Sequence, residues 1–425
     1  MVFVLVNFKN TTFKNSIYTI IIQSFIELIL FCNNILFARF LSIKMYGQYQ
    51  YGVSVATIIG LVATLGAGGG LLSKYWGQSD YFGFKKKQRT FFVYNWFWNK
   101  GVVFLSLFSF CLFLLYFYFQ FISFITFYTL LLSFAFFQIN LLVAFFIAQK
   151  KVIFGNALQL IFQLLIFIWI GIIKLIDIKN ANIIFCGLVL LLIAYSFLIH
   201  CTQLKKYGLK KITPSKDNIS FVLLQWGGII CAYADLILLK IFSSDSHIAL
   251  YSVALQMSTV ISFALGAINL NIRSQVAEDY HQLNRQQFQQ KIKEYTTTIA
   301  TISSVLIVII IPLSYFIFPL YGHEYQSSYS IFLILMIGQI VNVFSGSVGL
   351  ILSMSGYAKI PARTFYLAFC INIVLSLSLI HNLDSHGVAI GVAVSQAIWN
   401  LILLYYVIKI LKINPTVFTF LNKYT

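Results

Sequence analysis

The sequence contains few charged residues. Only 9% of its 425 residues are charged, whereas 60% are hydrophobic, and the mean hydropathy is +0.87. Soluble globular domains usually carry about 25% charged residues. The composition therefore excludes an ordinary water-soluble protein and predicts an integral membrane protein whose main solvent is lipid.

Paired cysteines and enzyme motifs are also absent. The sequence has no nucleophile elbow, phosphate-binding loop, HExxH or CxxC motif. The six cysteines are scattered without paired spacing, which favours neither a metal site nor a disulfide framework. They are Cys32, Cys111, Cys186, Cys201, Cys231 and Cys370. We therefore expect no enzymatic activity, no cofactor and no bound metal.

Long apolar runs dominate the chain. A helix needs roughly 20 mostly apolar residues to cross a hydrocarbon core of about 30 Å, whereas barrel strands are runs of about ten residues with alternating polarity. The expected spans are 16–40, 46–72, 91–117, 121–148, 152–173, 182–202, 218–241, 247–272, 295–320, 329–354, 361–381 and 386–409. The sequence thus predicts an all-α integral membrane protein of about 12 transmembrane helices with short connections.

Positive charge alternates along these connections. The formal net charge is +18, and most of the 29 Lys and Arg residues fall on every second connection. With both termini in the cytoplasm, the outer ends hold only Arg39, Lys44, Lys174, Lys179 and Lys240. This distribution obeys the positive-inside rule. It also excludes a nucleic-acid partner, because the cations follow the topology.

A basic connection lies at the midpoint of the chain. It contains Gly208 and Pro214, which are typical of a linker. We predict an N-terminal six-helix lobe at 1–204, a basic cytoplasmic linker at 205–217 and a C-terminal six-helix lobe at 218–425.

The two halves also resemble each other weakly near their first two helices. The matching positions are Asn34, Arg39 and Tyr49 in the first half and Asp235, Lys240 and Tyr251 in the second. One inserted residue aligns the two sets. Such repeats are common in membrane transporters.

Charged residues at membrane depth are the first candidate functional residues. An ionisable side chain near the bilayer centre costs at least about 2.5 to 3.5 kcal/mol and is normally retained for function. Glu27 falls near the middle of the first span, Lys100 within the third and Asp235 in the outer half of the seventh. Glu27 and Asp235 are candidates for a cavity acid or for coupling to H⁺ or Na⁺. For Asp235, a structural pairing or capping role is the alternative.

Two further cations, Arg39 and Lys240, lie closer to the outer ends of their helices. Long cations there can reach water, so both could be interface anchors. Their matching positions in the two halves favour the other interpretation, in which they line a substrate cavity together with Lys100. Such a cavity suits an anionic substrate such as a phosphate-bearing lipid headgroup.

Short motifs follow one another along nearly the whole chain. They are Ala38-Arg39-Phe40-Leu41, Tyr46-Gly47-Gln48-Tyr49, Ala234-Asp235, Tyr251, Pro319-Leu320-Tyr321-Gly322-His323-Glu324-Tyr325, and Gly346, Gly349 and Gly356 before Lys359. In their order and spacing the sequence resembles the polysaccharide transporter family. These Wzx-type flippases of lipid-linked oligosaccharide repeat units belong to the multidrug, oligosaccharidyl-lipid and polysaccharide exporter superfamily.

The resemblance implies a MATE-like, V-shaped bundle of two six-helix lobes in the bacterial cytoplasmic (inner) membrane. Its substrate would be an undecaprenyl-diphosphate-linked repeat unit of O antigen, as in lipopolysaccharide biosynthesis, or of another surface polysaccharide. Alternating access would carry this substrate to the outer leaflet. Membrane lipids, the polysaccharide polymerase and the chain-length regulator are the implied partners. By this resemblance, Arg39 matches a family cation and Asp235 matches the family's acidic position. The resemblance does not decide whether Lys240 takes the place of a family arginine, so it leaves open which residue contacts the phosphate.

Two other functions are weighed against the flippase. A cation-coupled multidrug antiporter of the same superfamily would favour a cavity dominated by carboxylates, and here the charges at membrane depth are mixed. A polysaccharide polymerase would need a substantial outer loop or a carboxylate-rich cytoplasmic site. The longest outer connections have only about ten residues.

Overall fold

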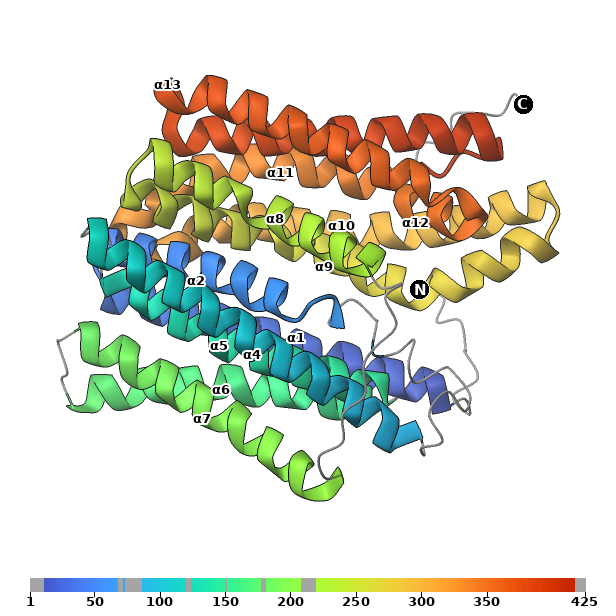
Figure 1. The fold of residues 1–425 in the computed structure, drawn as a ribbon. Coiled ribbons are helices and arrows are strands. Elements are labelled where there is room, and N and C mark those ends of the chain that lie inside the picture. The colour runs from blue at the N-terminus through green and yellow to red at the C-terminus, as the bar shows by residue number, and fades with distance from the viewer. Residues whose placement is uncertain are drawn as a thin grey trace. The chain divides into compact units, whose positions relative to one another are not determined.

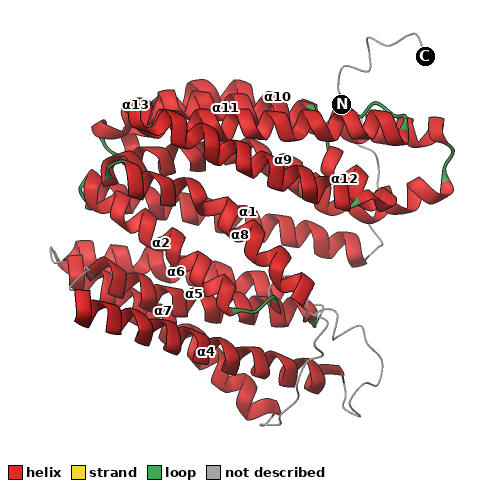
Figure 2. Cartoon of the chain, turned by 45° about the horizontal axis from the view of Figure 1, so that its top comes forward, coloured by secondary structure: helices red, strands yellow, loops and turns green. Residues whose placement is uncertain are grey.

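Helices make up nearly all of the chain that the structure describes. The computed structural model describes residues 11–67, 72, 86–119, 124–149, 151–176, 181–207 and 219–416, and every regular element within them is a helix (Figures 1 and 2). In chain order these are α1 (Thr11–Phe40), α2 (Ile43–Ala63), α4 (Lys86–Phe119), α5 (Phe124–Ala148), α6 (Val152–Ile176), α7 (Ala181–Tyr207), α8 (Ile219–Phe242), α9 (Asp245–Gln282), α10 (Arg285–Tyr321), η3 (His323–Ser327), α11 (Ser328–Phe344), α12 (Val348–Leu352), η4 (Ser353–Tyr357), α13 (Lys359–Tyr406) and η5 (Val407–Leu411). Each predicted span overlaps a helix, so the prediction of an all-helical membrane protein is confirmed.

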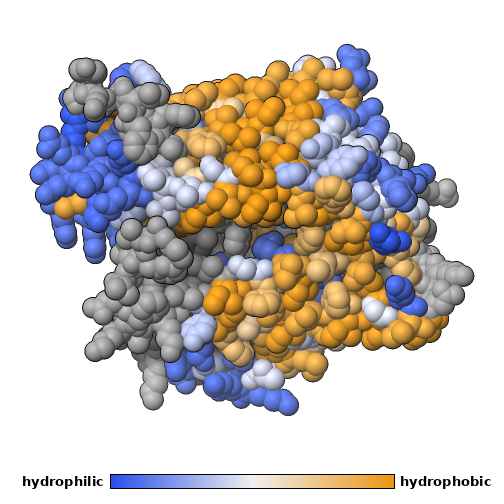
Figure 3. All heavy atoms as spheres, turned by 180° about the vertical axis from the view of Figure 1, so that it is seen from behind, coloured by the Kyte–Doolittle hydropathy of each residue, from blue (hydrophilic) through white to orange (hydrophobic). Residues whose placement is uncertain are grey.

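Much of the surface is apolar. Seven stretches of the described chain are long and apolar enough to cross a membrane: Ile21–Phe40, Tyr128–Ala148, Val152–Ile176, Cys186–Tyr207, Arg285–Tyr321, His323–Phe344 and Lys359–Leu411. Large apolar side chains such as Leu175, Val308 and Phe316 lie exposed along them. Apolar atoms also cover a broad part of the face in Figure 3. A surface of this kind is suited to contact with lipid.

The helix α13 contains two of the predicted spans. Its 48 residues would extend about 72 Å as one straight helix, more than twice the hydrocarbon thickness. The backbone leaves the helical conformation at Asp384, where φ is 46° and ψ is −125°. Figure 1 accordingly shows α13 as two antiparallel arms, which correspond to the predicted spans 361–381 and 386–409.

The predicted span 329–354 is interrupted. Gly346, with φ of 75°, separates α11 from α12, and Gly356, with φ of 92°, bends the chain before α13. A Cβ atom at Gly346 would stand 2.7 Å from the main-chain oxygen of Pro415. Positive φ and close packing both favour glycine at this position. Hydropathy predicted one continuous helix here because the apolar composition continues across the break.

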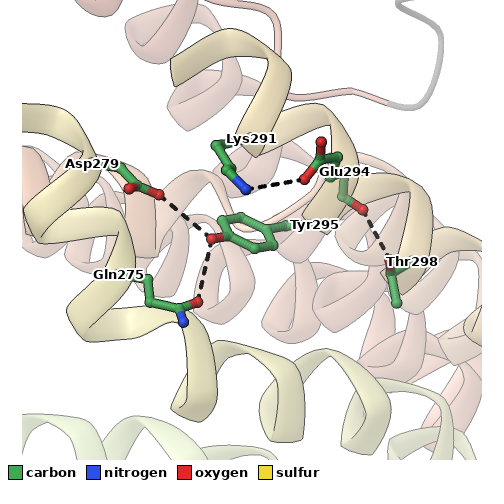
Figure 4. A network of polar contacts seen from close by, with 6 residues as sticks. All are labelled: Gln275, Asp279, Lys291, Glu294, Tyr295 and Thr298. Atoms are coloured by element: carbon green, nitrogen blue, oxygen red, sulfur yellow. Dashed lines mark hydrogen bonds and ion pairs between the residues drawn. The ribbon is translucent and has the colours of Figure 1, made fainter. Parts of the chain in front are cut away.

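The helices α9 and α10 are longer than a membrane span. They contain 38 and 37 residues, so each is about 55 Å long. Their joined ends form the yellow hairpin in Figure 1. Asn284 and Gln287 form a capping box at the start of α10. Tyr295 Oη then donates to Gln275 and Asp279 of α9, which ties the two helices together (Figure 4).

The C-terminal segment packs along the same hairpin. Arg285 Nε donates to the main-chain oxygen of Lys412 over 2.7 Å. Gln289 donates to the oxygen of Asn414 over 2.7 Å and accepts from its N–H over 2.6 Å. An apolar cluster lies beneath these bonds, formed by Ile272, Val276, Phe288, Ile292, Val348, Ile351, Leu352, Leu403, Val407 and Ile413. The segment is therefore an integral part of the packing at this end of α10.

The chain divides into two compact units. The first comprises Met1–Phe37 and Gln48–Ala234, and the second comprises Ala38–Gly47 and Asp235–Thr425. In the first, α5 packs against α4, α6 and α7; in the second, α11 packs against α9 and α13. Most of the predicted linker at 205–217, including Gly208 and Pro214, lies outside the described residues. The predicted lobe boundaries therefore stay a prediction.

Candidate functional site

The second unit holds a buried carboxylate, that of Asp235 on α8. Its exposed fraction is only 7%. Tyr251 Oη of α9 donates to Asp235 Oδ2 over 3.1 Å, and Asn372 Nδ2 of α13 donates to Oδ1 over 2.9 Å. Within the described residues no cation forms an ion pair with it. Two neutral donors thus compensate for the water that the carboxylate has lost.

The first arm of α13 supplies a further member of the cluster. Ser376 lies one turn after Asn372, on the same helix face. Its hydroxyl donates to Asn372 Oδ1 over 3.0 Å. The second arm closes the cluster with Gly391, where a Cβ atom would come within 2.3 Å of Ser376 Oγ. The turn at Asp384 therefore brings a residue without a side chain against this polar group.

The cluster offers hard oxygen atoms: one carboxylate, one amide and two hydroxyls. Among the described residues there is no group of three or more His, Cys, Asp and Glu side chains that could hold a metal ion. A single buried carboxylate with neutral oxygens is chemically suited to one proton or one monovalent cation.

The first unit has a neutral counterpart. Asn33 Nδ2 of α1 donates to the main-chain oxygen of Gln163 on α6 over 3.0 Å and to its Oε1 over 3.4 Å. Gln50 Nε2 of α2 donates to Asn34 Oδ1 over 3.0 Å. These bonds join α1 to α2 and α6, as Asp235 joins α8 to α9 and α13. The residues differ from the predicted echo, because Asn34 bonds to Gln50 and its neighbour Asn33 supplies the contact with α6, so the echo stays a prediction.

Arg39, predicted as a cavity cation, contacts the end of α10. Its exposed guanidinium donates through Nε to the oxygen of Leu320 over 2.6 Å and through Nη2 to that of Pro319 over 3.4 Å. Carbonyl groups at a helix C-terminus lack intrahelical partners and carry partial negative charge. Arg39 therefore serves in this conformation as a cap for α10.

Lys240 is paired across the turn between α8 and α9. Its Nζ lies 2.5 Å from Asp245 Oδ1, and 35% of its side chain is exposed. Of the two acids near it in sequence, Asp245 and not Asp235 is the partner in this ion pair. The sequence alone did not predict whether Lys240 pairs with Asp235, because residues five apart do not share a helix face.

Lys100 and Glu27 lie at the surface of the first unit. Both are exposed, and Lys100 Nζ stands 6.0 Å from the ring centre of Trp96. Glu27 shares its stretch of α1 with exposed Phe25 and Leu28. Neither residue joins a buried cluster like that of Asp235. Their predicted roles as a substrate cation and a coupling acid stay predictions.

His200 on α7 is a buried polar residue that was not identified from the sequence. This histidine is 1% exposed, its Nδ1 lies 2.8 Å from Tyr94 Oη, and its ring stacks on Trp98 at 4.1 Å. The available signal was a lone histidine inside an apolar run. Nothing in the sequence links Asn372 to Asp235 either, because the two residues lie 137 positions apart.

Solved structures with the same arrangement of helices are transporters. Lipid II flippase MurJ in an inward closed conformation matches with a TM-score of 0.66 and 15% identity over 92% of this chain and 87% of that chain. An inward-facing multidrug resistance MATE family transporter of the MOP superfamily matches with a TM-score of 0.67 and 13% identity over 91% and 94%. The chain has the fold of these membrane transporters.

A MOP superfamily transporter from Pyrococcus furiosus gives a TM-score of 0.60 at 10% identity over 93% of this chain and 94% of that chain. No protein-family model matches the sequence, and no curated protein matches it. The likeness to these solved structures thus shows the fold, that of an all-helical multi-pass membrane protein.

Proposed function

We propose that this chain is a flippase for undecaprenyl-diphosphate-linked oligosaccharide repeat units. It moves the lipid-linked sugar from the cytoplasmic to the outer leaflet of the bacterial inner membrane by alternating access, with both termini in the cytoplasm. The observation that carries this proposal is the fold shared with a lipid II flippase along nearly the full length of both chains. The order of the polysaccharide transporter motifs in the sequence supports it.

Arg39, Lys240 and Lys100 are the proposed contacts for the diphosphate. All three keep part of the side chain exposed. Arg39 uses Nε and Nη2 for main-chain oxygens, and neither bond involves Nη1. A guanidinium is suited to binding phosphate through such a free edge. Lys240 would have to exchange Asp245 for the substrate.

Asp235 is the proposed site for a coupling ion, either H⁺ or Na⁺. The reason is its burial among neutral oxygen-bearing side chains, with no ion pair to a cation of the described chain. A bound cation would neutralise a charge that is costly at membrane depth. Binding of the ion would change the hydrogen bonds that Tyr251 and Asn372 donate to the carboxylate, and so would affect the positions of α9 and α13. Glu27 is the second candidate acid.

A cation-coupled multidrug antiporter is the alternative function. The buried acid favours it, and the MATE transporter has a TM-score close to that of the lipid II flippase. The mixed charges of the proposed cavity residues favour the flippase, since a cationic drug would be repelled by Arg39, Lys240 and Lys100. A polysaccharide polymerase is a weaker alternative, because the solved neighbours are named as transporters and a flippase.

The test is complementation of a strain that lacks its own repeat-unit flippase. Surface glycan is scored at matched membrane levels for wild type, Arg39→Ala, Lys240→Ala and the charge-preserving Arg39→Lys and Lys240→Arg. Lys174→Ala, an exposed cation on α6, is the control. We expect wild type, the control and the charge-preserving variants to restore glycan, and the two alanine variants to lose it.

Restoration by both alanine variants would show that these cations are not needed for the substrate. Failure of well-expressed wild type in several repeat-unit backgrounds would overturn the flippase proposal. Drug resistance conferred by the same wild-type protein would then support the antiporter. Co-purification of the polymerase or the chain-length regulator from a complemented strain would test the proposed partners separately.

A further inference from the structure

The predicted inner ends of α4, α5, α6 and α7 meet around aromatic rings in the first unit. Phe91, on the second turn of α4, is fully buried. Its ring stacks on that of Tyr207, the last residue of α7, with ring centres 5.0 Å apart, and lies 5.9 Å from that of Phe145 near the end of α5. Phe146 meets Phe154 of α6 with ring centres 4.7 Å apart. These contacts hold the four helix ends together.

Exposed lysines lie at the same helix ends. Lys87 is on the first turn of α4, Lys151 directly precedes α6, and Lys205 and Lys206 are on the last turn of α7. The Nζ of Lys206 stands 5.7 Å from the centre of the neighbouring tyrosine ring. We call these four residues the lysine collar. All four present their charge to the surroundings of the protein.

The charge of the lysine collar is not compensated by acids. Within the described residues, none of its four lysines forms an ion pair. The sequence explains this, because Asp177, between the predicted spans 152–173 and 182–202, is the only acid from residue 81 to residue 216. The joined ends of α9 and α10 differ, since they carry Glu294, which pairs with Lys291 over 3.5 Å. The collar is therefore a surface of one sign, whereas the hairpin of α9 and α10 is mixed.

Two buried amides belong to the same helix ends. Gln149, directly after α5, is 5% exposed, and Asn156, on the second turn of α6, is 4% exposed. Gln149 Nε2 and Asn156 Nδ2 have no hydrogen-bond acceptor in the described chain. Unpaired N–H donors are dipoles that add to a positive potential. The amides and the lysines thus favour the same kind of ligand, an anion with several acceptor oxygens.

Exposed apolar side chains continue from the lysine collar along the helices. The collar lies at the ends of apolar stretches long enough to cross a membrane, so it falls at the predicted membrane surface. Phe154, three residues after Lys151, is 49% exposed, and Leu198, two turns before Lys205, is 66% exposed. A phospholipid fits both parts, with its phosphate at the lysines and its acyl chains along the apolar side chains. A soluble anion would use only the lysines.

We propose that the lysine collar binds the headgroup of an anionic phospholipid of the inner leaflet. The acyl chains of this lipid lie along Phe154 and Leu198. The collar shares no residue with the proposed diphosphate contacts or with Asp235, so the inference rests on the position of these helices in the membrane and not on the proposed substrate. It makes the packing of the first unit's inner end dependent on the lipid composition of the membrane.

Titration of the purified full-length protein with phosphatidylglycerol tests this proposal. Native mass spectrometry measures the affinity, and hydrogen–deuterium exchange locates the bound lipid, with zwitterionic phosphatidylcholine as the reference. The collar variant combines three changes, Lys151→Gln, Lys205→Gln and Lys206→Gln. Its matched control removes the same charge from exposed cations of the second unit through Lys291→Gln, Lys359→Gln and Arg363→Gln.

We expect phosphatidylglycerol to slow exchange in residues 151–156 and 202–207 of wild type and of the control. The collar variant should bind it about tenfold or more weakly, because each lysine near an anionic headgroup contributes to binding, and should lose the slowing. Arginine at the same three positions keeps the charge and should keep the affinity, which separates a lost site from a misfolded protein.

Three results would overturn the proposal. Wild-type affinity in the collar variant would show that the lysines do not bind the lipid. Equal slowing by phosphatidylcholine would show that the site does not select an anionic headgroup. Slowing of the same segments by inorganic phosphate alone would identify a site for soluble anions instead of a lipid.

Discussion

At the scale of single residues, Asp235 shows how far the sequence could lead. Its position within an apolar span was sufficient to identify it as a candidate, because buried charge is rare and costly in lipid. Its partners could not be derived, since Asn372 is more than 130 residues away in the chain. Arg39 and Lys240 were identified from their matching positions in the two halves, but their contacts with Leu320 and Asp245 depend on the packing of helix ends, which periodicity does not encode.

Asp235→Asn should remove a specific response to a cation. A cation that binds only the folded protein stabilises it by mass action, by about 2.7 kcal/mol at a hundredfold excess over Kd. We therefore expect the melting temperature of wild type to rise when NaCl replaces KCl at constant ionic strength, and that of Asp235→Asn to stay unchanged. Thermal unfolding in detergent measures this, with the exposed acid replaced in Glu324→Gln as the control.

The proton would be identified as the ion if the melting temperature of wild type rose on lowering the pH but did not respond to sodium. Asp235→Asn should then abolish this rise in melting temperature. Equal responses in wild type and Asp235→Asn to both sodium and pH would contradict the assignment of Asp235.

At the scale of elements, the apolar runs predicted where helices lie but not where they break. Gly346 and Asp384 interrupt or reverse the chain through backbone angles that hydropathy does not register. The predicted spans 247–272 and 295–320 also stop short of the joined ends of α9 and α10, whose polar turns are held by the capping box at Asn284 and by the hydrogen bonds of Tyr295. Local capping and tertiary contacts decide these boundaries.

Gln289→Ala should loosen the C-terminal segment, whereas Gln290→Ala should not. Gln289 makes two hydrogen bonds to the main chain of Asn414, each worth about 0.5 to 1.5 kcal/mol. Its neighbour Gln290 is exposed and provides a matched control on the same helix. Faster hydrogen exchange of residues 411–416 in Gln289→Ala alone is the expected result. Equal exchange in the two variants would show that Ile413 and the apolar cluster hold the segment without the amide.

At the scale of the whole molecule, the all-helical transporter fold could be predicted from the sequence, whereas the composition of the compact units could not. The number of apolar runs and the alternation of charge are global features that the membrane itself imposes. The assignment of Ala38–Gly47 to the second unit depends instead on local fit, namely on Tyr46 against Tyr325 and Gly47 against Asp245.

The predicted topology places both termini in the cytoplasm. A fluorescent protein that folds only in the cytoplasm should be bright when fused after Thr425, and a periplasmic phosphatase fused there should be inactive. The positive-inside rule gives this expectation, because Lys409, Lys412 and Lys423 lie near that end. Alkylation of Ser244→Cys by an impermeant reagent in intact spheroplasts should place the turn between α8 and α9 outside. The opposite pattern in both assays would invert the topology.

Each compact unit contains a short segment from the other half of the chain. Neither half of the chain therefore contains all the residues of one unit. A fragment ending near residue 204 lacks the part of α8 up to Ala234 that clusters with it, and a fragment beginning near residue 218 lacks Ala38–Gly47. Each half would insert into the membrane with a gap in its packing that only the other half can fill. Separately expressed halves should therefore be degraded when alone and accumulate when produced together, which makes the midpoint of the chain a natural place to build a split reporter of assembly.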